Sequence, residues 1–465
     1  MVRGPFRGAI QAYGRRMRSP RSPSSPAFWR SPLRGTWFTS VLGVVLLVGI
    51  TVLFVTGLVS YAAYNPNLSR VNDMTPDKGL LGFYLFSWPT GPVWLYRLNQ
   101  GVHVTLGIVL IPVLLAKLWS VVPKLFTLPP ARSLAHALER ISLLLLVGGA
   151  LFEFTTGVLN VQLDYIFPGS FYTLHFYGAW VFFAAFVVHA ALKMPTVVRN
   201  LRARRDARDA RDARDVRDPD APRDEPDEPD EPDEPDEQDE QDEQDEQDEL
   251  VSPNPAEPTV SRRGALAFVG GGSLLLFITT AGQSFDGPLR QTAVLAPHGG
   301  SEPGSGPGGF QINKTAASRG IIPAETSEEA WRLVVAGPGG TVRLSRAELL
   351  QLPLYSAALP IACVEGWSTS DQWWRGVRLR DLAALVGYET DAAPDVMVES
   401  LQRRGAFRQA ALRDNQVRDP RSLLALFVNG EELTPDHGYP ARIIVPAAPG
   451  VLNTKWVARM TFGDL

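Results

Sequence analysis

The residues best suited to redox chemistry are a single cysteine and a group of histidines in apolar segments. Cys363 is the only cysteine in 465 residues, and it lies in the segment LPIACVEGW beside Glu365 and Gly366. A lone cysteine can bind a metal, react as a thiol or fill an apolar core, and its residue type leaves these interpretations open. One cysteine cannot form an intramolecular disulfide, a CxxC site or a cluster with several thiolate ligands. Electron transfer within this chain would therefore need another kind of cofactor.

Four of the six histidines lie in or at the edge of apolar segments, and an imidazole in a bilayer is by default a functional-site hypothesis. His175 and His189 are 14 residues apart, which is about 21 Å along one face of a helix and suits two stacked haems. We expect His103 and His175 to bind an outer haem iron, and His136 and His189 an inner one. The position 14 residues after His103 is Lys117, so the inner pair is less regular. The alternative is that these histidines hydrogen-bond to neighbouring helices.

A weak internal repeat accompanies these histidines. Thr56-Gly57, near the end of the first apolar segment, is matched by Thr156-Gly157, near the end of the third. Each pair is followed by a loop and by a helix with a histidine close to its outer end, His103 and His175. We therefore expect two related helical hairpins that hold these two histidines at similar depth.

Five apolar segments are long enough to be transmembrane helices. The first is TWFTSVLGVVLLVGITVLFVTGLVSYAAY, and the others cover roughly 99–122, 139–160, 172–194 and 264–282. Lys and Arg are concentrated before the first segment, between the second and third, and after the fourth. This bias predicts that those regions are cytoplasmic and that residues after about 283 are extracytoplasmic. The chain is thus expected to be a multi-pass protein of the cell membrane, in contact with lipid.

Three regions lack the pattern of a packed core. Residues 1–36 form a basic tail that we expect to be disordered, 198–261 is a charged low-complexity cytoplasmic linker, and 284–309 is a Gly/Pro linker. The linker at 198–261 starts with Arg-Asp-Ala triplets that could extend the preceding helix. The fifth membrane segment, 262–283, starts with SRRGALAFVG, which resembles a twin-arginine export signal, although Arg262 and Arg263 could equally be positive-inside anchors.

Residues 310–465 have the size of one domain. AWRLVVAG and TVRLSRAELLQLP predict a strand, a turn and a strand that enters a helix, and GVRLRDLAALVG predicts an amphipathic helix that ends at Gly387. DVMVESL, LALFVNGEEL and ARIIVPA predict strands, with a hairpin turn at Asn429-Gly430. Cys363 is expected at the end of a short strand, where it enters a glycine-containing loop. These patterns indicate an α+β domain rich in β-structure.

The membrane block, 37–197, resembles the b-type cytochrome subunits of bacterial membrane hydrogenases and formate dehydrogenases. Those proteins are four-helix diheme cytochromes whose last helix carries two histidines at this spacing. The resemblance implies a four-helix bundle that binds one or two haem b groups. That family usually has a ligand on its first helix, whereas this chain has no histidine there.

The motifs LPIACVEGWSTSDQWWRGVRLRDLAALVG, DHGYPARIIVP and LNTKWVARM resemble the molybdopterin-binding domain of the sulfite oxidase type. That family includes sulfite dehydrogenases and bacterial protein-methionine-sulfoxide reductases, and the motifs occur in its order. The resemblance implies that Cys363 binds molybdenum through sulfur. It also implies a set of cofactor-binding residues, which are Asn313, Ser400, His437, Arg442, Asn453, Thr454 and Lys455.

Together these features predict an all-α membrane bundle with a fifth membrane helix, followed by the α+β molybdopterin domain. The expected function is extracytoplasmic oxygen-atom transfer on a small oxyanion or a sulfur or nitrogen oxide, with haem b passing electrons to a quinone or a protein partner. Trp373, Trp374 and Arg375 are candidates for a substrate funnel, and Arg375, Arg403 or Arg404 for an oxyanion contact. No nucleic-acid partner is expected. The alternative function is a non-catalytic transmembrane haem carrier whose degenerate outer domain binds a partner.

Overall fold

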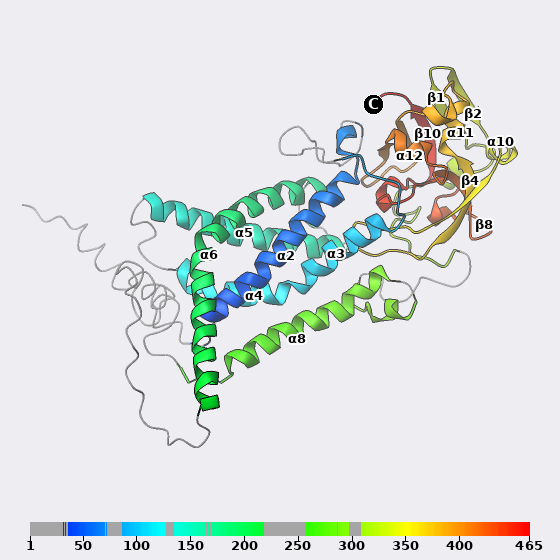
Figure 1. Cartoon of the computed structure of the whole chain (residues 1–465). Coiled ribbons are helices and arrows are strands. Elements are labelled where there is room, and N and C mark those ends of the chain that lie inside the picture. Colours follow the sequence, from blue (N-terminus) through cyan, green and yellow to red (C-terminus); the bar gives the residue numbers. More distant parts are fainter. Residues whose placement is uncertain are drawn as a thin grey trace, which may run out of the picture. The chain divides into compact units, whose positions relative to one another are not determined.

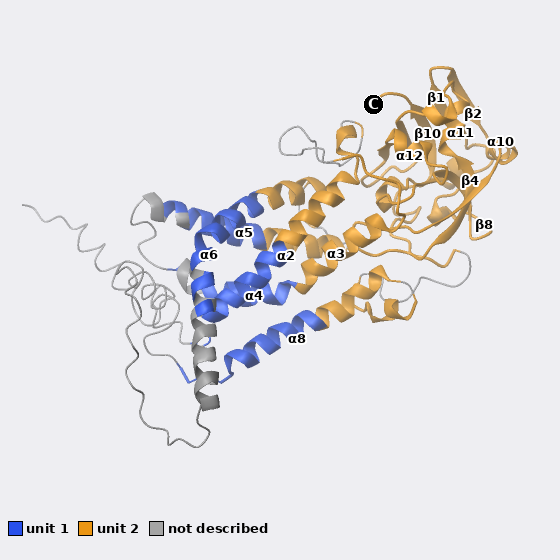
Figure 2. Ribbon diagram, in the orientation of Figure 1, with its two compact units in different colours: residues 1–50, 110–150, 181–274 blue, residues 51–109, 151–180, 275–465 orange. Residues whose placement is uncertain are grey.

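We describe the chain from a computed structural model. It describes residues 31, 33, 36–69, 71, 86–126, 134–162, 166, 169–217, 256, 257, 259–285, 287–296 and 308–465. The chain divides into two compact units (Figure 2). Unit 1 comprises Met1–Ile50, Leu110–Ala150 and Val181–Leu274, and unit 2 comprises Thr51–Val109, Leu151–Trp180 and Leu275–Leu465. Most of the predicted tail, most of the charged linker and residues 297–307 of the Gly/Pro linker lie outside the described residues.

Within the described residues, six long helices contain the apolar segments of the chain (Figure 1). They are α2 (Thr36–Ala62), α3 (Leu95–Val109), α4 (Ile111–Leu125), α5 (Leu134–Val161), α6 (Phe171–Arg217) and α8 (Arg262–Thr280). Five stretches of them are long and apolar enough to cross a membrane, namely Trp37–Ala62, Leu95–Val121, Arg140–Val161, Phe171–Pro195 and Arg262–Ser284. The prediction of five such helices is confirmed.

Two of the apolar segments are not single uninterrupted helices confined to the apolar stretch. The second apolar segment was expected to be one helix, but it is interrupted at Leu110, two residues before Pro112. Proline has no N–H for a helical hydrogen bond and is tolerated only in the first turn, so α4 begins anew there. Helix α6 continues past the apolar span through Pro195 to Arg217, and the predicted helical extension into the Arg-Asp-Ala triplets is confirmed.

Two five-stranded sheets form the C-terminal part of unit 2 (Figure 1). The first has the order β2-β1-β10-β5-β6, and the second has β3-β4-β7-β8 with β9 paired to β7. Among the pairs of strands that the structure describes, β1–β10 is the parallel one, with Val335 opposite Met460. The strands are β1 (Leu333–Gly337), β2 (Gly340–Leu344), β3 (Tyr355–Leu359), β4 (Gln372–Arg378), β5 (Val396–Ser400), β6 (Gln409–Leu412), β7 (Leu423–Val428), β8 (Glu431–Glu432), β9 (Arg442–Ile444) and β10 (Val457–Phe462).

Short helices connect these strands, which gives the expected sheet-rich α+β domain. They are α10 (Arg346–Gln351), α11 (Leu379–Ala384), α12 (Asp414–Arg418) and the 3₁₀ elements η5 (Thr390–Ala392), η6 (Pro435–His437) and η7 (Gly450–Leu452). Other short helices precede β1, namely η2 (Pro66–Leu68), η3 (Ala281–Ser284), η4 (Gly287–Thr292) and α9 (Pro323–Thr326).

Two local predictions for the sheet domain, a hairpin turn and an amphipathic helix, can be compared with the structure. Asn429 and Gly430 have φ angles of 51° and 89°, so the predicted β7–β8 hairpin turn is confirmed. The amphipathic helix predicted from GVRLRDLAALVG is wrong in its first part, because the residues up to Arg378 belong to β4 and only α11 is helical. A Cβ at Gly376 would lie 2.0 Å from the Leu424 carbonyl oxygen, so pairing with β7 leaves no room for a side chain there.

Two apolar cores lie in unit 2. One fills the sheet domain and includes Leu333, Leu382, Ile443 and Met460, all fully buried. The other contains residues of the C-terminal domain together with residues near the ends of α2 and α3. Its members include Tyr64, Trp88, Tyr96, Cys363, Trp374 and Phe407.

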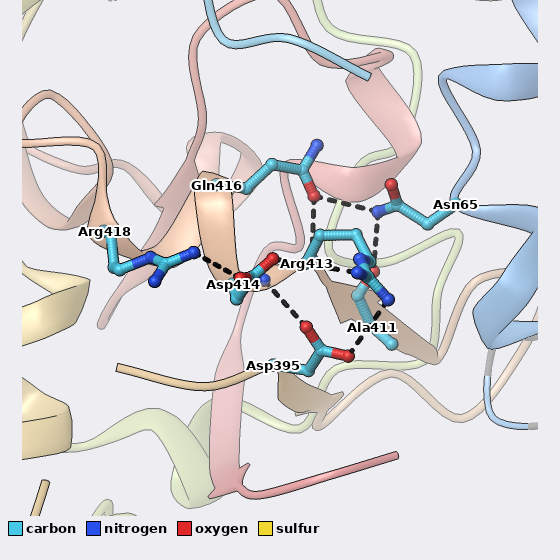
Figure 3. A network of polar contacts seen from close by, with 7 residues as sticks. All are labelled: Asn65, Asp395, Ala411, Arg413, Asp414, Gln416 and Arg418. Carbon is cyan, nitrogen blue, oxygen red and sulfur yellow. Dashed lines mark hydrogen bonds and ion pairs between the residues drawn. The ribbon is translucent and has the colours of Figure 1, made fainter. Parts of the chain in front are cut away.

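A polar network accompanies this second core (Figure 3). The Asn65 amide follows α2 and donates to the Ala411 carbonyl at 3.1 Å and to Gln416 Oε1 at 2.8 Å. Gln416 Oε1 also accepts from the Arg413 N–H at 3.0 Å. Asn65 adopts the left-handed conformation, with φ 52°, which asparagine tolerates better than most residues. The end of α2 is thus joined to α12 by specific hydrogen bonds within unit 2.

Candidate functional site

Cys363 lies in a tight loop four residues after β3, close to the strand end predicted for it. Its N–H donates to the Trp367 carbonyl at 2.9 Å, and the Gly366 N–H donates to the Cys363 carbonyl at 3.1 Å. Gly366 has a φ of 89°, which favours glycine and lets the loop fold back on itself. Cys363 as a whole is 8% exposed. The loop therefore fixes a buried sulfur.

Polar side chains converge on this sulfur. Asn313 Nδ2 lies 3.5 Å from Cys363 Sγ and 3.3 Å from Glu365 Oε2, so the predicted residue Asn313 contacts the cysteine. Burial and the neighbouring Glu365 carboxylate raise the pKa of the Cys363 thiol well above its ordinary value. Burial also raises the pKa of Glu365. Lys314 opposes both shifts, but burial outweighs it, so both groups favour their neutral forms.

A second group of predicted residues gathers around Arg442. This guanidinium is 2% exposed, and it donates to the carbonyls of His437 at 3.0 Å and Asn453 at 3.3 Å. Lys455 Nζ donates to the carbonyls of Lys314 at 2.9 Å and Asp436 at 2.6 Å. Among the residues that the structure describes, neither cation forms an ion pair with a carboxylate. Two cations are therefore largely removed from water without a directly paired carboxylate, although Asp436 lies close enough to act on Lys455.

The electrostatics of this group suit an anion. Burial lowers the pKa of Arg442 to about 9, and burial together with Arg442 lowers the pKa of Lys455. Burial and the two cations lower the pKa of His437 to about 4. Three buried polar atoms of this group have no hydrogen-bond partner among the described residues, namely Arg442 Nε, His437 Nε2 and Thr454 Oγ1. A bound phosphate would neutralise the cations and could occupy these donors, so the residues fit the phosphate of a pterin cofactor.

Two further predicted residues stabilise the backbone around the cations. Asn453 Oδ1 accepts from the Val445 N–H at 2.9 Å. Ser400 Oγ donates to the Lys455 carbonyl at 2.7 Å and accepts from the Gln402 N–H at 3.1 Å. The segment 313–314 links the two groups, because Asn313 contacts Cys363 while the Lys314 carbonyl accepts from Lys455. The structure thus brings the predicted cofactor-binding residues into one region.

The proposed substrate-funnel residues separate. They alternate along β4, so Trp374 is fully buried whereas Trp373 is 56% exposed. Trp374 Nε1 donates to the Leu359 carbonyl at 3.0 Å, and its ring lies 5.0 Å from the Arg442 guanidinium carbon. Trp374 therefore packs against Arg442 inside the domain, whereas Trp373 and Arg375 are exposed, and the role of these residues in a substrate funnel stays a prediction. Of the other oxyanion candidates, Arg403 pairs with Glu325 and Arg404 is exposed.

A second candidate centre lies between α3 and α6. The imidazoles of His103 and His175 have ring centroids 6.4 Å apart. Thr56 Oγ1 lies 3.0 Å from His103 Nδ1, and Thr156 Oγ1 lies 3.2 Å from His175 Nδ1. The internal repeat therefore has a structural basis, because equivalent threonines contact both rings. Because Nδ1 of each imidazole contacts a threonine, Nε2 is the ring nitrogen that could bind a metal.

The two hairpins differ at one position. His103 Nδ1 lies 3.1 Å from the Leu53 carbonyl, whereas His175 Nδ1 lies 2.9 Å from the carboxylate of Glu153, which is 7% exposed. Leu53 and Glu153 are equivalent in the repeat, since each precedes its threonine by three residues. Glu153 was missed, although a single carboxylate in an apolar helix is a recognisable sequence signal.

The inner histidine pair has less support. His189 lies 14 residues after His175 on α6, and His136 lies near the start of α5. The side chain of His136 is outside the described residues. The pairing of His136 with His189 therefore stays a prediction.

Three tyrosines from the helix ends lie near the cysteine group and were also missed. Tyr64 Oη lies 3.1 Å from Tyr96 Oη, and the Tyr172 ring centroid lies 5.5 Å from that of Tyr64. Tyr172 also packs edge-on to Phe407, with centroids 5.1 Å apart. Tyrosines at helix ends are common at membrane interfaces, so their types alone did not single them out.

Comparison with known proteins gives consistent matches for the C-terminal part of the chain. The sequence profile of a family described as "Oxidoreductase molybdopterin binding domain" matches residues 319–464. The uncharacterized oxidoreductase YuiH of Bacillus subtilis is 32% identical over 144 residues, which cover 31% of this chain and 70% of that protein. Mitochondrial sulfite oxidase of Homo sapiens is 32% identical over 160 residues, covering 29% of each chain. Nitrate reductase [NAD(P)H] of Hordeum vulgare is 39% identical over 94 residues, or 19% of this chain and 10% of that protein.

Proposed function

The chain belongs to the family of oxidoreductases with a molybdopterin-binding domain, and we propose that it is a membrane-bound molybdenum enzyme. In this proposal it transfers an oxygen atom to or from a small sulfur or nitrogen compound, and haem b exchanges the electrons with a quinone or a protein partner. The observation that carries the proposal is that one compact unit holds both the Cys363–Arg442 region and the neighbouring imidazoles of His103 and His175.

The cofactor assignment rests on donor chemistry. Cys363 would bind molybdenum through its sulfur, and Asn313 would orient that sulfur. Arg442, Lys455 and His437 would hold the phosphate, with Thr454 and Asn453 in the same loop. When bound, the molybdenum cofactor supplies two-electron oxygen-atom transfer. The unpaired Arg442 Nε and His437 Nε2 support this assignment, because buried donors normally have partners.

The haem assignment rests on the geometry of two imidazoles. His103 and His175 would hold the haem iron, and their imidazoles are close enough together to bind one metal ion at metal–nitrogen distances of about 2 Å. The separation of 6.4 Å between His103 and His175 fits this arrangement. A Cβ at Gly57 would lie 3.3 Å from His103 Cε1, so glycine leaves room for the ring. Two histidine ligands would make the haem an electron carrier without an open coordination position.

The membrane assignment rests on the five apolar helices and on the charges between them. The distribution of Lys and Arg supports a cytoplasmic acidic linker and an extracytoplasmic C-terminal domain. Substrate would then be converted outside the cytoplasm, while the helices exchange electrons with a quinone in the lipid or with a partner protein. Both the direction of the reaction and the choice between a sulfur and a nitrogen compound are outcomes of the test below.

The test uses the full chain, purified from a host that makes the molybdenum cofactor. Molybdenum is measured by mass spectrometry and haem by its optical bands. Sulfite is then added to the oxidised protein, and a sulfoxide, an N-oxide or nitrate to the reduced protein. Appearance of the reduced haem bands with sulfite, or their bleaching with an oxide, is the expected result. A folded protein with haem and no molybdenum would instead support the non-catalytic carrier.

A further inference from the structure

The Cys363 loop is held by residues of the helices as well as by its own domain. Gln100 on α3 is 5% exposed, and both ends of its amide are used. Its Nε2 donates to the Val364 carbonyl at 2.6 Å, and its Oε1 accepts from Ser60 Oγ on α2 at 2.8 Å. The residue after the cysteine is therefore hydrogen-bonded directly to α3.

Close packing reinforces this hydrogen bond. A Cβ added to Gly366 would lie 2.7 Å from Val104 Cβ, so the loop backbone rests against α3 with no room for a side chain. Ser284 Oγ, in η3, donates to the Gly366 carbonyl at 2.6 Å. The Ser368 N–H donates to the Gln283 carbonyl at 3.1 Å. The loop is thus fixed on α3 and on the element that follows α8.

The same stretch of α3 carries the candidate haem ligand. Tyr96, Gln100 and Val104 form a buried stripe with a spacing of four residues, which is one side of the helix. His103 is three residues after Gln100, a rise of about 4.5 Å along the axis. The ring of His103 lies beside the stripe formed by Tyr96, Gln100 and Val104, and it contacts Thr56 and Gly57 of α2. One short helical segment therefore contacts the cysteine loop and the imidazole pair.

We infer that the contact of Gln100 with Val364 and of Val104 with Gly366 is the junction through which electrons pass between the Cys363 centre and the haem held by His103. This inference rests on the proposed function. The electron would cross from the Cys363–Val364 backbone through the hydrogen bond to Gln100, and then along α3 to His103. Electron tunnelling weakens steeply with distance, and it is stronger through bonds and hydrogen bonds than through gaps. Gln100 and Val104 are thus positioning residues, which need not touch substrate.

The step that we test is the transfer of one electron from the ferrous haem, which becomes ferric, to the oxidised molybdenum centre, which is reduced by one electron. The full chain with both cofactors is photoreduced by a laser flash with a deazaflavin and a sacrificial donor, so no substrate is needed. The haem bands then report electron arrival followed by departure. We expect Gln100→Leu to slow the departure phase several-fold, with the haem spectrum and the molybdenum content unchanged.

Gly366→Ala provides a second variant and Gly430→Ala its matched control. Both glycines have a φ of 89°, but a Cβ at Gly430 meets nothing within 4 Å. In the molybdenum-free full chain, hydrogen exchange of residues 363–368 should accelerate in Gly366→Ala and stay unchanged in Gly430→Ala. The departure phase should slow in Gly366→Ala alone.

Two results overturn the inference while the proposed function stands. One is a departure phase as fast as in the unmodified protein in both Gln100→Leu and Gly366→Ala. The other is equal slowing in Gly366→Ala and Gly430→Ala. Absence of molybdenum or haem from the unmodified protein is a separate result that overturns the proposed function itself.

Discussion

The imidazole rings of His103 and His175 are neighbours in an edge-on arrangement, with centroids 6.4 Å apart and planes at 86°. They come from different helices, α3 and α6, and each is contacted by the threonine of a Thr-Gly pair on another helix. Such second contacts fix the ring orientation and the tautomer of a metal-binding histidine. This relationship is the basis for the first two predictions.

Replacing His103 or His175 by leucine should remove one haem. Each side chain would supply one of two axial nitrogens, and loss of either leaves an incomplete ligand set. Haem per protein, measured from the optical bands, should fall by one equivalent while molybdenum content is retained. Unchanged haem content in both variants would show that these imidazoles serve only helix packing.

Glu153→Gln should raise the midpoint potential of the haem held by His175. The carboxylate lies 2.9 Å from His175 Nδ1, and its negative charge favours the ferric form. We expect a shift on the order of tens of millivolts in an optical redox titration. Glu153→Asp, which keeps the charge, should shift the potential less. Equal shifts in the two variants would argue against a role for the charge.

Cys363→Ser should abolish turnover and leave the haem bands intact. The sulfur is replaced by a harder oxygen, which is a poorer partner for a metal with sulfur ligands. Turnover with the substrate found in the optical assay is the measurement, and the haem spectrum of the same sample is the control. A variant that retains turnover would contradict the ligand role.

Local signals in the sequence identified much of the fold. The five apolar helices follow from hydropathy alone, and the turn at Asn429-Gly430 follows from the preference of these residues for positive φ. The helix predicted up to Gly387 failed in its first part because pairing of Gly376 with β7 outweighs the local amphipathic pattern. The candidate sites at Cys363 and Arg442 came from short motifs, and the structure places both residues in buried positions with polar neighbours.

The contacts between the helix ends and the domain could not be predicted in this way. Gln100 and Val364 are 264 residues apart, and Asn65 and Gln416 are 351 apart. Neither polar residue has a local pattern that names its partner, because a buried amide at a helix end is compatible with many neighbours. Their roles follow only from the folded structure.

Asn65→Ala should loosen the attachment of α12. Two hydrogen bonds, to Ala411 and Gln416, are lost from a buried position, at a cost of about 1–3 kcal/mol in unfolding free energy. Hydrogen exchange of residues 411–416 should accelerate. Asn65→Gly is the matched control, because it also loses the amide but tolerates the φ of 52°. The glycine variant should lose less unfolding free energy than the alanine variant. A larger loss in the glycine variant would show that the left-handed backbone at position 65 does not disfavour alanine.

His437 should make the cofactor-free protein sensitive to acid. Its pKa is lowered from 6.5 to about 4 by burial and by the neighbouring Arg442 and Lys455. Between these two pH values the unfolded chain binds a proton that the folded chain does not, so the free energy of unfolding should fall as the pH decreases from 6.5 to 4. The loss from this group is at most about 3 kcal/mol.

Thermal unfolding of the unmodified protein and of His437→Gln, compared across this pH range, should show that the stability of the variant depends less steeply on pH. Loading the cofactor should also flatten the slope of the unmodified protein, because a phosphate near His437 favours the protonated ring. Equal slopes in the variant and the unmodified protein would assign the acid sensitivity to other groups.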